Sequence, residues 1–248
     1  MAESSTSEKR VRSGQRHILY DASLVEQPDV DLFDIDNLRS QADAHSLAAG
    51  RSHAVFFRHQ GRTLVLKHYQ RGGGMAALLD DKYIGWDCDY SRSFREWRLL
   101  KAMHQLELPV PAPVAALCSQ HGLFYRADLI TLQIRDVTPL ADHLMQHPGD
   151  LQTWVAVGRC LRRFHDASVY HADLNARNIL LEPHRHDIYL IDFDKGAFRS
   201  IGESWKAANL VRLQRSLLKF KSLYQGFSYD QQDWNALLEG YNRTENLT

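Results

Sequence analysis

Cysteines, long apolar runs and an excess of either charge are all scarce or absent in this sequence of 248 residues. The three cysteines, Cys88, Cys118 and Cys160, are odd in number and far apart. They therefore predict neither a zinc site nor a disulfide framework, and they favour a reducing compartment without a disulfide-linked partner. No apolar run approaches the ~18 residues of a membrane-spanning helix. Residues 1–10 also lack the apolar stretch of a secretory signal.

The charges balance, but they are unevenly distributed along the chain. Lysine plus arginine and aspartate plus glutamate each number 30, so the formal net charge is zero. A protein that binds nucleic acid through bulk charge is usually basic, so we expect no nucleic-acid partner. Residues 21–43 carry seven acidic side chains and one basic, whereas residues 195–221 carry seven basic and one acidic. A neutral chain can therefore still present one basic surface.

The distribution of apolar residues divides the chain into three parts. Residues 1–16 are rich in Ser, Lys and Arg and have very few apolar side chains, which predicts a disordered leader. Short apolar and β-branched runs dominate the part that follows, and helical periodicity dominates the last part. The sequence predicts an α+β fold of two lobes, a β-rich lobe over residues 17–135 and a mainly helical lobe over residues 136–248.

Local patterns place individual elements within these lobes. Two apolar runs at 52–59 and 63–69 flank Gln60-Gly61 and predict a β-hairpin. Helical spacing of large apolar side chains predicts a helix over 89–106. Asp150 precedes a second strongly periodic segment, so we expect it to cap a helix that runs through His165.

One stretch carries most of the chemistry, and it reads His171-Ala172-Asp173-Leu174-Asn175-Ala176-Arg177-Asn178, with Asp192-Phe193-Asp194 after a short hairpin. Phosphoryl transfer needs a carboxylate that orients the acceptor hydroxyl and takes its proton. It also needs oxygen ligands for Mg²⁺ and a fixed cation for the phosphates of ATP. Asp173 fits the first role, and Asn178 and Asp192 fit the second. Lys67, on the second strand of the predicted hairpin, fits the third.

This order of motifs resembles the eukaryotic-type protein kinase fold over roughly residues 45–200. The resemblance implies an ATP-binding lobe in which Glu96 is the ion-pair partner of Lys67. Ser93-x-x-Glu96 is also a capping-box pattern, in which Glu96 would only cap its own helix. The glycine-rich loop expected before Lys67 is reduced to Gly50, where the backbone either covers the phosphates or forms a plain turn.

Departures from the protein-kinase pattern narrow the class of substrate. Ala172 replaces the arginine that pairs with a phosphorylated activation loop in regulated protein kinases. No Ala-Pro-Glu follows Asp192, and Asp194 replaces the hinge glycine. The resemblance therefore implies a kinase without this on/off control, acting on a small molecule or glycan rather than on a protein.

Longer phrases resemble the 3-deoxy-D-manno-octulosonic acid (Kdo) kinases over nearly the whole chain after residue 16. These phrases are 170–181, 189–196, Leu66-Lys67-His68-Tyr69, Phe94-Arg95-Glu96, Leu108-Pro109-Val110-Pro111, Trp205-Lys206 and the helical segment 210–218. The resemblance implies phosphorylation of the 4-hydroxyl of Kdo on an anionic lipid A precursor, with ATP and Mg²⁺. It places the reaction in lipopolysaccharide core synthesis, with the enzyme peripheral on the cytoplasmic face of the inner membrane of a Gram-negative bacterium.

The basic segment suits such an anionic acceptor. On the helix expected over 209–223, Arg212, Arg215 and Lys219 share one face. The opposite face carries Leu210, Leu213 and Leu217. The basic face is either the ordinary solvated side of an amphipathic helix or a surface that attracts the anionic acceptor or membrane.

Two other functions stay open at this stage. Aminoglycoside- and choline-kinase-like phosphotransferases also use a His-x-Asp loop, although they usually carry glycine at the position of Ala172. A pseudokinase that binds ATP as a scaffold is disfavoured, because Lys67, Asp173, Asn178 and Asp192 are all present.

Overall fold

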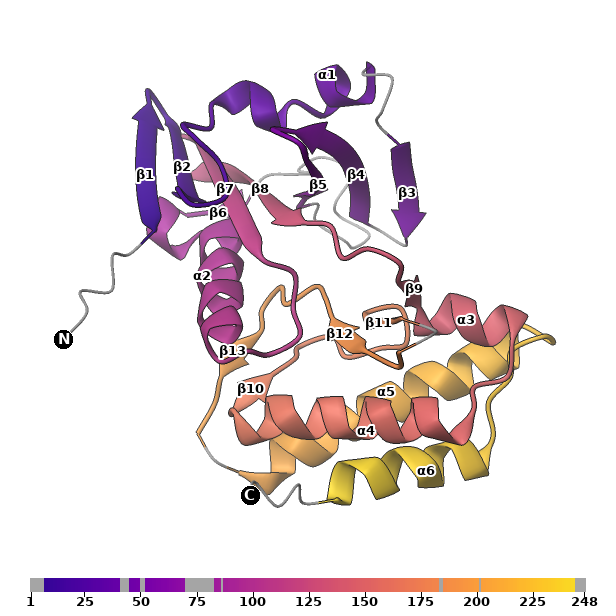
Figure 1. Ribbon diagram of the computed structural model, residues 1–248. Coiled ribbons are helices and arrows are strands. Elements are labelled where there is room, and N and C mark those ends of the chain that lie inside the picture. The colour runs from indigo at the N-terminus through magenta and orange to yellow at the C-terminus, as the bar shows by residue number, and fades with distance from the viewer. Residues whose placement is uncertain are drawn as a thin grey trace. The chain divides into compact units, whose positions relative to one another are not determined.

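The chain folds into two compact units, one built mainly from strands and one mainly from helices (Figure 1). The computed structural model describes residues 7–40, 45–49, 52–69, 83–85, 87–182, 185–200 and 202–243. The first unit comprises residues 1–101 and 112–133, and the second comprises residues 102–111 and 134–248. The predicted α+β class, with strands early and helices late, is confirmed.

The first unit is organised around one antiparallel sheet. Its strands within the described residues are β1 (Glu8–Ser13), β2 (Arg16–Asp21), β3 (His45–Ala49), β4 (Ser52–His59), β5 (Arg62–His68), β6 (Tyr83–Ile84), β7 (Pro113–His121) and β8 (Phe124–Leu132). They pair in the order β1-β2-β7-β8-β5-β4-β3, and β6 pairs with β8. Side chains of β2, β4, β5 and β7 form a core with the helical turns η1 (Val30–Phe33) and α1 (Ile35–Ser40). This core forms because alternate strand residues are apolar and share one face of the sheet.

Helix α2 (Arg92–Gln105) is attached to the same sheet by apolar and polar contacts. Phe94, Trp97 and Leu100 are buried at helical spacing, as the periodicity predicts. The Ser93 hydroxyl donates a hydrogen bond to the Leu117 carbonyl on β7. The helix is predicted over 89–106, but its first residues belong instead to the short turn η3 (Cys88–Tyr90), which precedes α2.

The predicted hairpin is present and has the turn that its sequence favours. Strands β4 and β5 are joined by Gln60 and Gly61, which have φ values of 48° and 74°. Two successive positive φ values define a turn whose twist matches that of the flanking strands, and glycine adopts such a φ without strain. The hairpin register places Lys67 opposite Ala54 on one side and Leu129 of β8 on the other.

The prediction of a disordered leader over residues 1–16 is wrong for the residues that the structure describes. Residues 8–13 form β1, which pairs with β2 along its whole length. Nearly all of β1 is exposed, so this strand needs no apolar side chains. Its pairing with β2 provides hydrogen-bond partners for its backbone N–H and C=O groups. An ion pair between Arg10 and Asp89, 2.8 Å long, adds a contact to η3. Low apolar content therefore indicates an edge strand here rather than disorder.

The prediction that the cysteines form no disulfide is also wrong. Cys88 and Cys118 form a disulfide between η3 and β7, with Cα atoms 5.7 Å apart. The tertiary structure brings them together across a sequence separation of 30, which spacing alone does not reveal. Cys160 is a buried free thiol, and burial raises its pKa to about 12. The expectation of a reducing compartment, which rested on unpaired cysteines, loses that support.

The second unit contains the long helices and short strand pairs. Its elements in the described ranges are β9 (Thr138–Pro139), α3 (Leu140–Gln146), α4 (Leu151–Asp166), β10 (Val169–Tyr170), β11 (Ile179–Leu181), β12 (Ile188–Leu190), β13 (Ala197–Phe198), α5 (Glu203–Leu223) and α6 (Gln231–Asn242). Strands β9, β11 and β12 form one small antiparallel sheet, and β10 pairs with β13. As predicted, the Asp150 side chain caps α4 by accepting from the Thr153 amide. None of the described helices combines the length and apolar character needed to cross a membrane.

Residues 102–111 belong to the second unit, although the predicted first lobe includes them. The Leu190 amide on β12 donates to the Pro109 carbonyl at 3.0 Å. Arg163 on α4 donates to the Glu107 carbonyl at 2.8 Å. The segment therefore packs with the helical unit because its backbone carbonyls find their donors there.

Two glycines allow α4 and α6 to pack with their backbones in contact. A Cβ atom on Gly158 would overlap the Leu237 carbonyl and lie 2.6 Å from the Tyr241 amide nitrogen. A Cβ atom on Gly240 would overlap the Val155 carbonyl in the same way. Because Val155 meets Gly240 while Gly158 meets Leu237, the two helices run antiparallel, side by side (Figure 1).

We expect Gly158→Ala to destabilise the second unit by about 3 kcal/mol or more, because backbone atoms cannot yield as a flexible side chain can. Gly226→Ala is the matched control, since the nearest atom to its Cβ would be 3.9 Å away. Urea unfolding followed by circular dichroism measures both free energies. Equal stability of the two variants would contradict the close helix packing.

Candidate active site

Lys67 and Glu96 form a buried ion pair in the first unit. Lys67 Nζ on β5 lies 3.1 Å from Oε1 and 3.0 Å from Oε2 of Glu96 on α2. The Tyr69 hydroxyl donates to the same carboxylate at 2.5 Å, and its ring lies 4.6 Å from Lys67 Nζ. The Glu96 side chain is only 3% exposed. The sheet and α2 therefore hold one cation at a fixed place, which is what binding of phosphates requires.

The capping-box interpretation of Ser93 and Glu96 is wrong. Ser93 lies inside α2, and its hydroxyl bonds to the Leu117 carbonyl rather than to its own helix. At the helix start, the Ser91 hydroxyl accepts from the Phe94 amide instead. Glu96 is thus available to Lys67. Gly50 lies outside the residues that the structure describes, so its predicted role at the phosphates stays a prediction.

His171 fixes the backbone of the loop between β10 and β11 in the second unit. Its Nδ1 accepts from the Asp173 amide at 3.1 Å, and its Nε2 lies 3.0 Å from the Ile191 carbonyl. Because Nδ1 is an acceptor, the proton is on Nε2, which donates to Ile191. The Phe193 ring packs on the imidazole with centroids 4.6 Å apart. One side chain therefore joins the loop that carries Asp173 to the strand end that precedes Asp192.

The loop leaves the Asp173 carboxylate exposed while its backbone is held on both sides. Asn178 Nδ2 donates to the Asp173 carbonyl at 2.9 Å. Asn175 Nδ2 donates to the same carbonyl at 3.0 Å and to Oδ2 of the Asp173 carboxylate at 3.1 Å. The Asp173 side chain is 62% exposed. A carboxylate that is fixed in position and open to solvent can receive the proton of an incoming hydroxyl.

Asn178 and Asp192 are brought together by the pairing of β11 with β12. The Ile191 amide donates to the Asn178 carbonyl at 3.0 Å, so the residue after Ile191 lies next to Asn178. Asp192 has a φ of 65°, a left-handed conformation that is rare outside glycine. The side-chain Nδ2 of Asn178 donates to the Asp173 carbonyl, so a cation bound by this side chain would be bound through Oδ1. One amide oxygen and one carboxylate are hard ligands of the kind that Mg²⁺ prefers.

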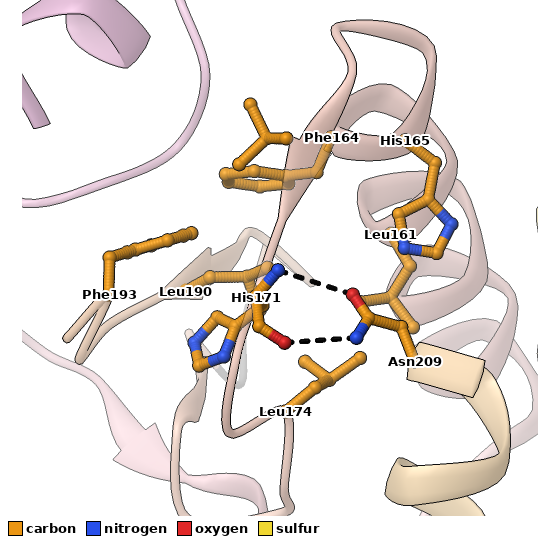
Figure 2. Close-up of a pocket in the computed structure, with 9 residues that line it drawn as sticks. Leu161, Phe164, His165, His171, Leu174, Leu190, Phe193 and Asn209 are labelled. Atoms are coloured by element: carbon orange, nitrogen blue, oxygen red, sulfur yellow. Dashed lines mark hydrogen bonds between the residues drawn. The ribbon is translucent and has the colours of Figure 1, made fainter. Parts of the chain in front are cut away.

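Helix α5 braces this loop through residues that the sequence analysis missed. Asn209 makes two reciprocal hydrogen bonds to the backbone of His171, at 3.2 Å to its amide and 2.9 Å to its carbonyl (Figure 2). The Ser216 hydroxyl accepts from the Ala176 amide at 3.2 Å. The signal available in the sequence was the position of Asn209, which falls at helical spacing with the apolar residues Leu213 and Leu217. Figure 2 also shows apolar side chains that line the same pocket, among them Leu161, Leu174 and Phe193.

His165 on α4 lies in the same buried layer and must stay neutral. Its Nδ1 is 2.8 Å from the Tyr241 hydroxyl, and its ring packs edge-on against Trp205. Burial lowers the pKa of His165 to about 4, against a smaller opposite effect of a hydrogen bond with Asn209. A histidine whose pKa falls on folding stabilises the protein above its unfolded pKa of 6.5. That stability is lost as the pH falls from 6.5 to about 4.

We expect the protein to lose about 2 kcal/mol of unfolding free energy from this group between pH 7 and pH 5. His165→Gln, which cannot titrate, should be less stable at pH 7 but should lose much less on acidification. Urea unfolding at the two pH values measures the difference. The control is the exposed His121→Gln, which should keep the wild-type dependence. An unchanged pH dependence in His165→Gln would contradict a buried neutral imidazole at this position.

Some basic residues of 195–221 have local partners, since Arg199 lies over the Tyr170 ring and Lys221 donates to the Tyr229 carbonyl. Leu213 and Leu217 of α5 are buried as predicted, and Arg212, Arg215 and Lys219 are exposed. Of these three, Arg212 alone forms an ion pair with the loop between β10 and β11 within the described residues, with Nη1 3.6 Å from Asp173 Oδ1.

Comparisons with known proteins identify the family of this chain. Residues 36–241 match the model of the lipopolysaccharide kinase (Kdo/WaaP) family. A protein of Photobacterium profundum named 3-deoxy-D-manno-octulosonic acid kinase is 36% identical over 93% of this chain and 97% of its own length. A protein of the same name from Stenotrophomonas maltophilia (strain R551-3) is 38% identical over 92% of this chain and 90% of its own length.

A solved structure described as WaaP in complex with acyl carrier protein is similar in fold. It has a TM-score of 0.55 and 17% sequence identity, over 89% of this chain and 88% of that one. The predicted two-lobed, kinase-like α+β fold and the resemblance to Kdo kinases are thereby confirmed. The chain belongs to the lipopolysaccharide kinase (Kdo/WaaP) family.

Proposed function

We propose that this protein transfers the γ-phosphoryl group of ATP to the 4-hydroxyl of Kdo on a lipid A precursor, as a step of lipopolysaccharide core synthesis. The observation that carries the proposal is the exposed Asp173 carboxylate on a loop whose backbone is held by His171 and Asn178. The near full-length similarity to proteins named 3-deoxy-D-manno-octulosonic acid kinase supports the choice of acceptor.

Asp173 is the proposed base. Its carboxylate accepts the proton of the acceptor hydroxyl as the oxygen attacks phosphorus, and its fixed backbone keeps it in place during transfer. The Asn175 amide holds Oδ2, so Oδ1 is the oxygen that faces the acceptor. Ala172 supplies no cation for a phosphorylated loop, so the site needs no prior phosphorylation to be competent.

Asn178 and Asp192 are the proposed Mg²⁺ ligands, and Lys67 is the proposed phosphate-binding cation. A Mg²⁺ ion held by these two side chains would supply positive charge against the charge that develops during phosphoryl transfer. The buried Glu96 carboxylate keeps the Lys67 ammonium from swinging into solvent, and the Tyr69 hydroxyl, which donates to the same carboxylate, holds that carboxylate in place. These roles suit the hard oxygen donors and the fixed cation described above.

We also propose that the enzyme works peripherally at the cytoplasmic face of the inner membrane, where ATP and a lipid-linked acceptor are both available. The exposed side of α5 supports this location. Arg215 and Lys219 are exposed there beside Val211 and Leu218, which are 45% and 52% exposed. A mixed basic and apolar helix surface is suited to an anionic membrane.

The test is ADP release by purified protein with ATP and Mg²⁺, using Kdo-lipid A precursor, an aminoglycoside, choline and no acceptor in separate reactions. We expect turnover only with the Kdo acceptor, and none from an Asp173→Asn preparation made in parallel. Turnover with choline or the aminoglycoside, and not with Kdo, would overturn the proposal. Co-sedimentation with anionic and neutral vesicles tests the location, which equal binding to both or to neither would contradict.

A further inference from the structure

Arg212 is placed beside Asp173 by contacts on both sides of it along α5. Asn209, one turn earlier, is bonded to His171, and Ser216, one turn later, is bonded to Ala176. These contacts fix the rotation of the helix, so the position of Arg212 next to the loop is a property of the fold. Arg212 Nη1 lies 3.6 Å from Asp173 Oδ1, and the Arg212 side chain is 50% exposed.

The contact between Arg212 and Asp173 is a poor structural ion pair. Charge-assisted hydrogen bonds of this type are usually ~2.7–2.9 Å long, and exposed pairs contribute little to stability. A guanidinium has five N–H donors in a planar fork. Within the part of the chain that the structure describes, Asp173 is the only ion-pair partner of Arg212. Most of its donors are therefore available to an anion from solution.

The proposed acceptor carries such an anion close to its reacting oxygen. This step of the argument rests on the proposed function. Kdo is a sugar acid, with its carboxylate on the first carbon and the proposed acceptor hydroxyl on the fourth. The carboxylate and this hydroxyl therefore lie within the span of one sugar ring. A site that binds both needs a cation next to the base, and Arg212 supplies it next to Asp173.

We propose that Arg212 binds the carboxylate of the acceptor sugar through a two-pronged ion pair and releases Asp173 as it does so. Oδ1 of Asp173 then accepts a hydrogen bond from the sugar hydroxyl that will be phosphorylated, while Asn175 keeps Oδ2 in place. No bond forms or breaks at Arg212, and the hydroxyl proton goes to Asp173. Arg212 thereby selects an acidic sugar over a neutral one and sets the position of the reacting oxygen.

The experiment compares wild type, Arg212→Gln, Arg212→Lys and the control Arg159→Gln, which removes an exposed arginine of α4 in the same unit. Each is assayed with Kdo-lipid A precursor and with the same acceptor in which only the sugar carboxylate is a methyl ester. We expect Arg212→Gln to raise KM for the acid acceptor roughly 10- to 100-fold, with KM for ATP unchanged. The KM of wild type should rise by the same factor when the ester replaces the acid, whereas the KM of Arg212→Gln should be the same for both acceptors. Arg212→Lys should recover only part, because an ammonium cannot form the two-pronged pair.

Each outcome decides the matter. Equal KM of wild type for acid and ester would overturn the inference without relying on any variant. A further loss of Arg212→Gln on the ester would also overturn it, and so would an Arg159→Gln variant as impaired as Arg212→Gln. Failure of wild type to turn over either acceptor would instead overturn the proposed function, and the inference with it.

Discussion

Asp173→Asn should lower kcat by about 10²- to 10⁴-fold, because the amide cannot take the proton of the acceptor hydroxyl. The substitution is nearly isosteric, and the amide oxygen can still accept from Asn175. The loop backbone is held by His171 and Asn178 rather than by the carboxylate, so we expect the fold and the affinity for ATP to be retained.

Steady-state ADP release and binding of a fluorescent ATP analogue separate the two effects. Asp142→Asn, an exposed carboxylate change on α3 in the same unit, is the control and should behave as wild type. An Asp173→Asn enzyme with near wild-type turnover would show that another group takes the proton.

Asp192→Ala should raise the Mg²⁺ concentration needed for half-maximal rate by at least about 10-fold. Even second-sphere partners of metal ligands typically contribute 10- to 100-fold to metal affinity, and Asp192 is proposed to bind the ion directly. The loss should be partly recovered at high Mg²⁺, since several ligands of this ion come from phosphates and water.

Asn178→Ala should differ from Asp192→Ala in its kcat at saturating Mg²⁺. Asn178 has a second role, because its Nδ2 holds the Asp173 carbonyl at 2.9 Å. We therefore expect Asn178→Ala to keep a lower kcat at saturating Mg²⁺, which Asp192→Ala should not do to the same extent. Magnesium titrations of both variants that match wild type would contradict the assignment of these ligands.

The sequence predicts the local elements of the site well because each depends on short-range patterns. The hairpin that carries Lys67 follows from two apolar runs around Gln60-Gly61, and the cap of α4 follows from Asp150. The ion pair of Lys67 with Glu96 was expected from the kinase resemblance, and the structure places the two in contact. The catalytic roles of Asp173, Asn178 and Asp192 are proposals that the experiments above test.

What the sequence could not supply depends on contacts between distant segments. Tyr69 completes the Glu96 cluster, and Asn209 holds His171 across 38 positions, yet no short-range pattern predicts either contact. Composition also misled at residues 8–13, because an exposed edge strand and a disordered leader have the same polar composition. The Cys88–Cys118 disulfide was missed for the same reason as the Asn209 contact, since only the folded chain brings the partners together.

The basic helix shows how one sequence pattern can contain several roles. Arg212, Arg215 and Lys219 form one cluster in the sequence, but the structure separates Arg212 from the other two by its contact with Asp173.

The position of the transferred phosphate is the most direct test of the account. The purified enzyme, ATP, Mg²⁺ and Kdo-lipid A precursor are incubated, and the product is examined by phosphorus–proton correlation NMR and mass spectrometry. We expect one added phosphate, on the oxygen of the fourth carbon of Kdo. A phosphate on lipid A or on another hydroxyl of the sugar, or no phosphorylated product at all, would contradict it.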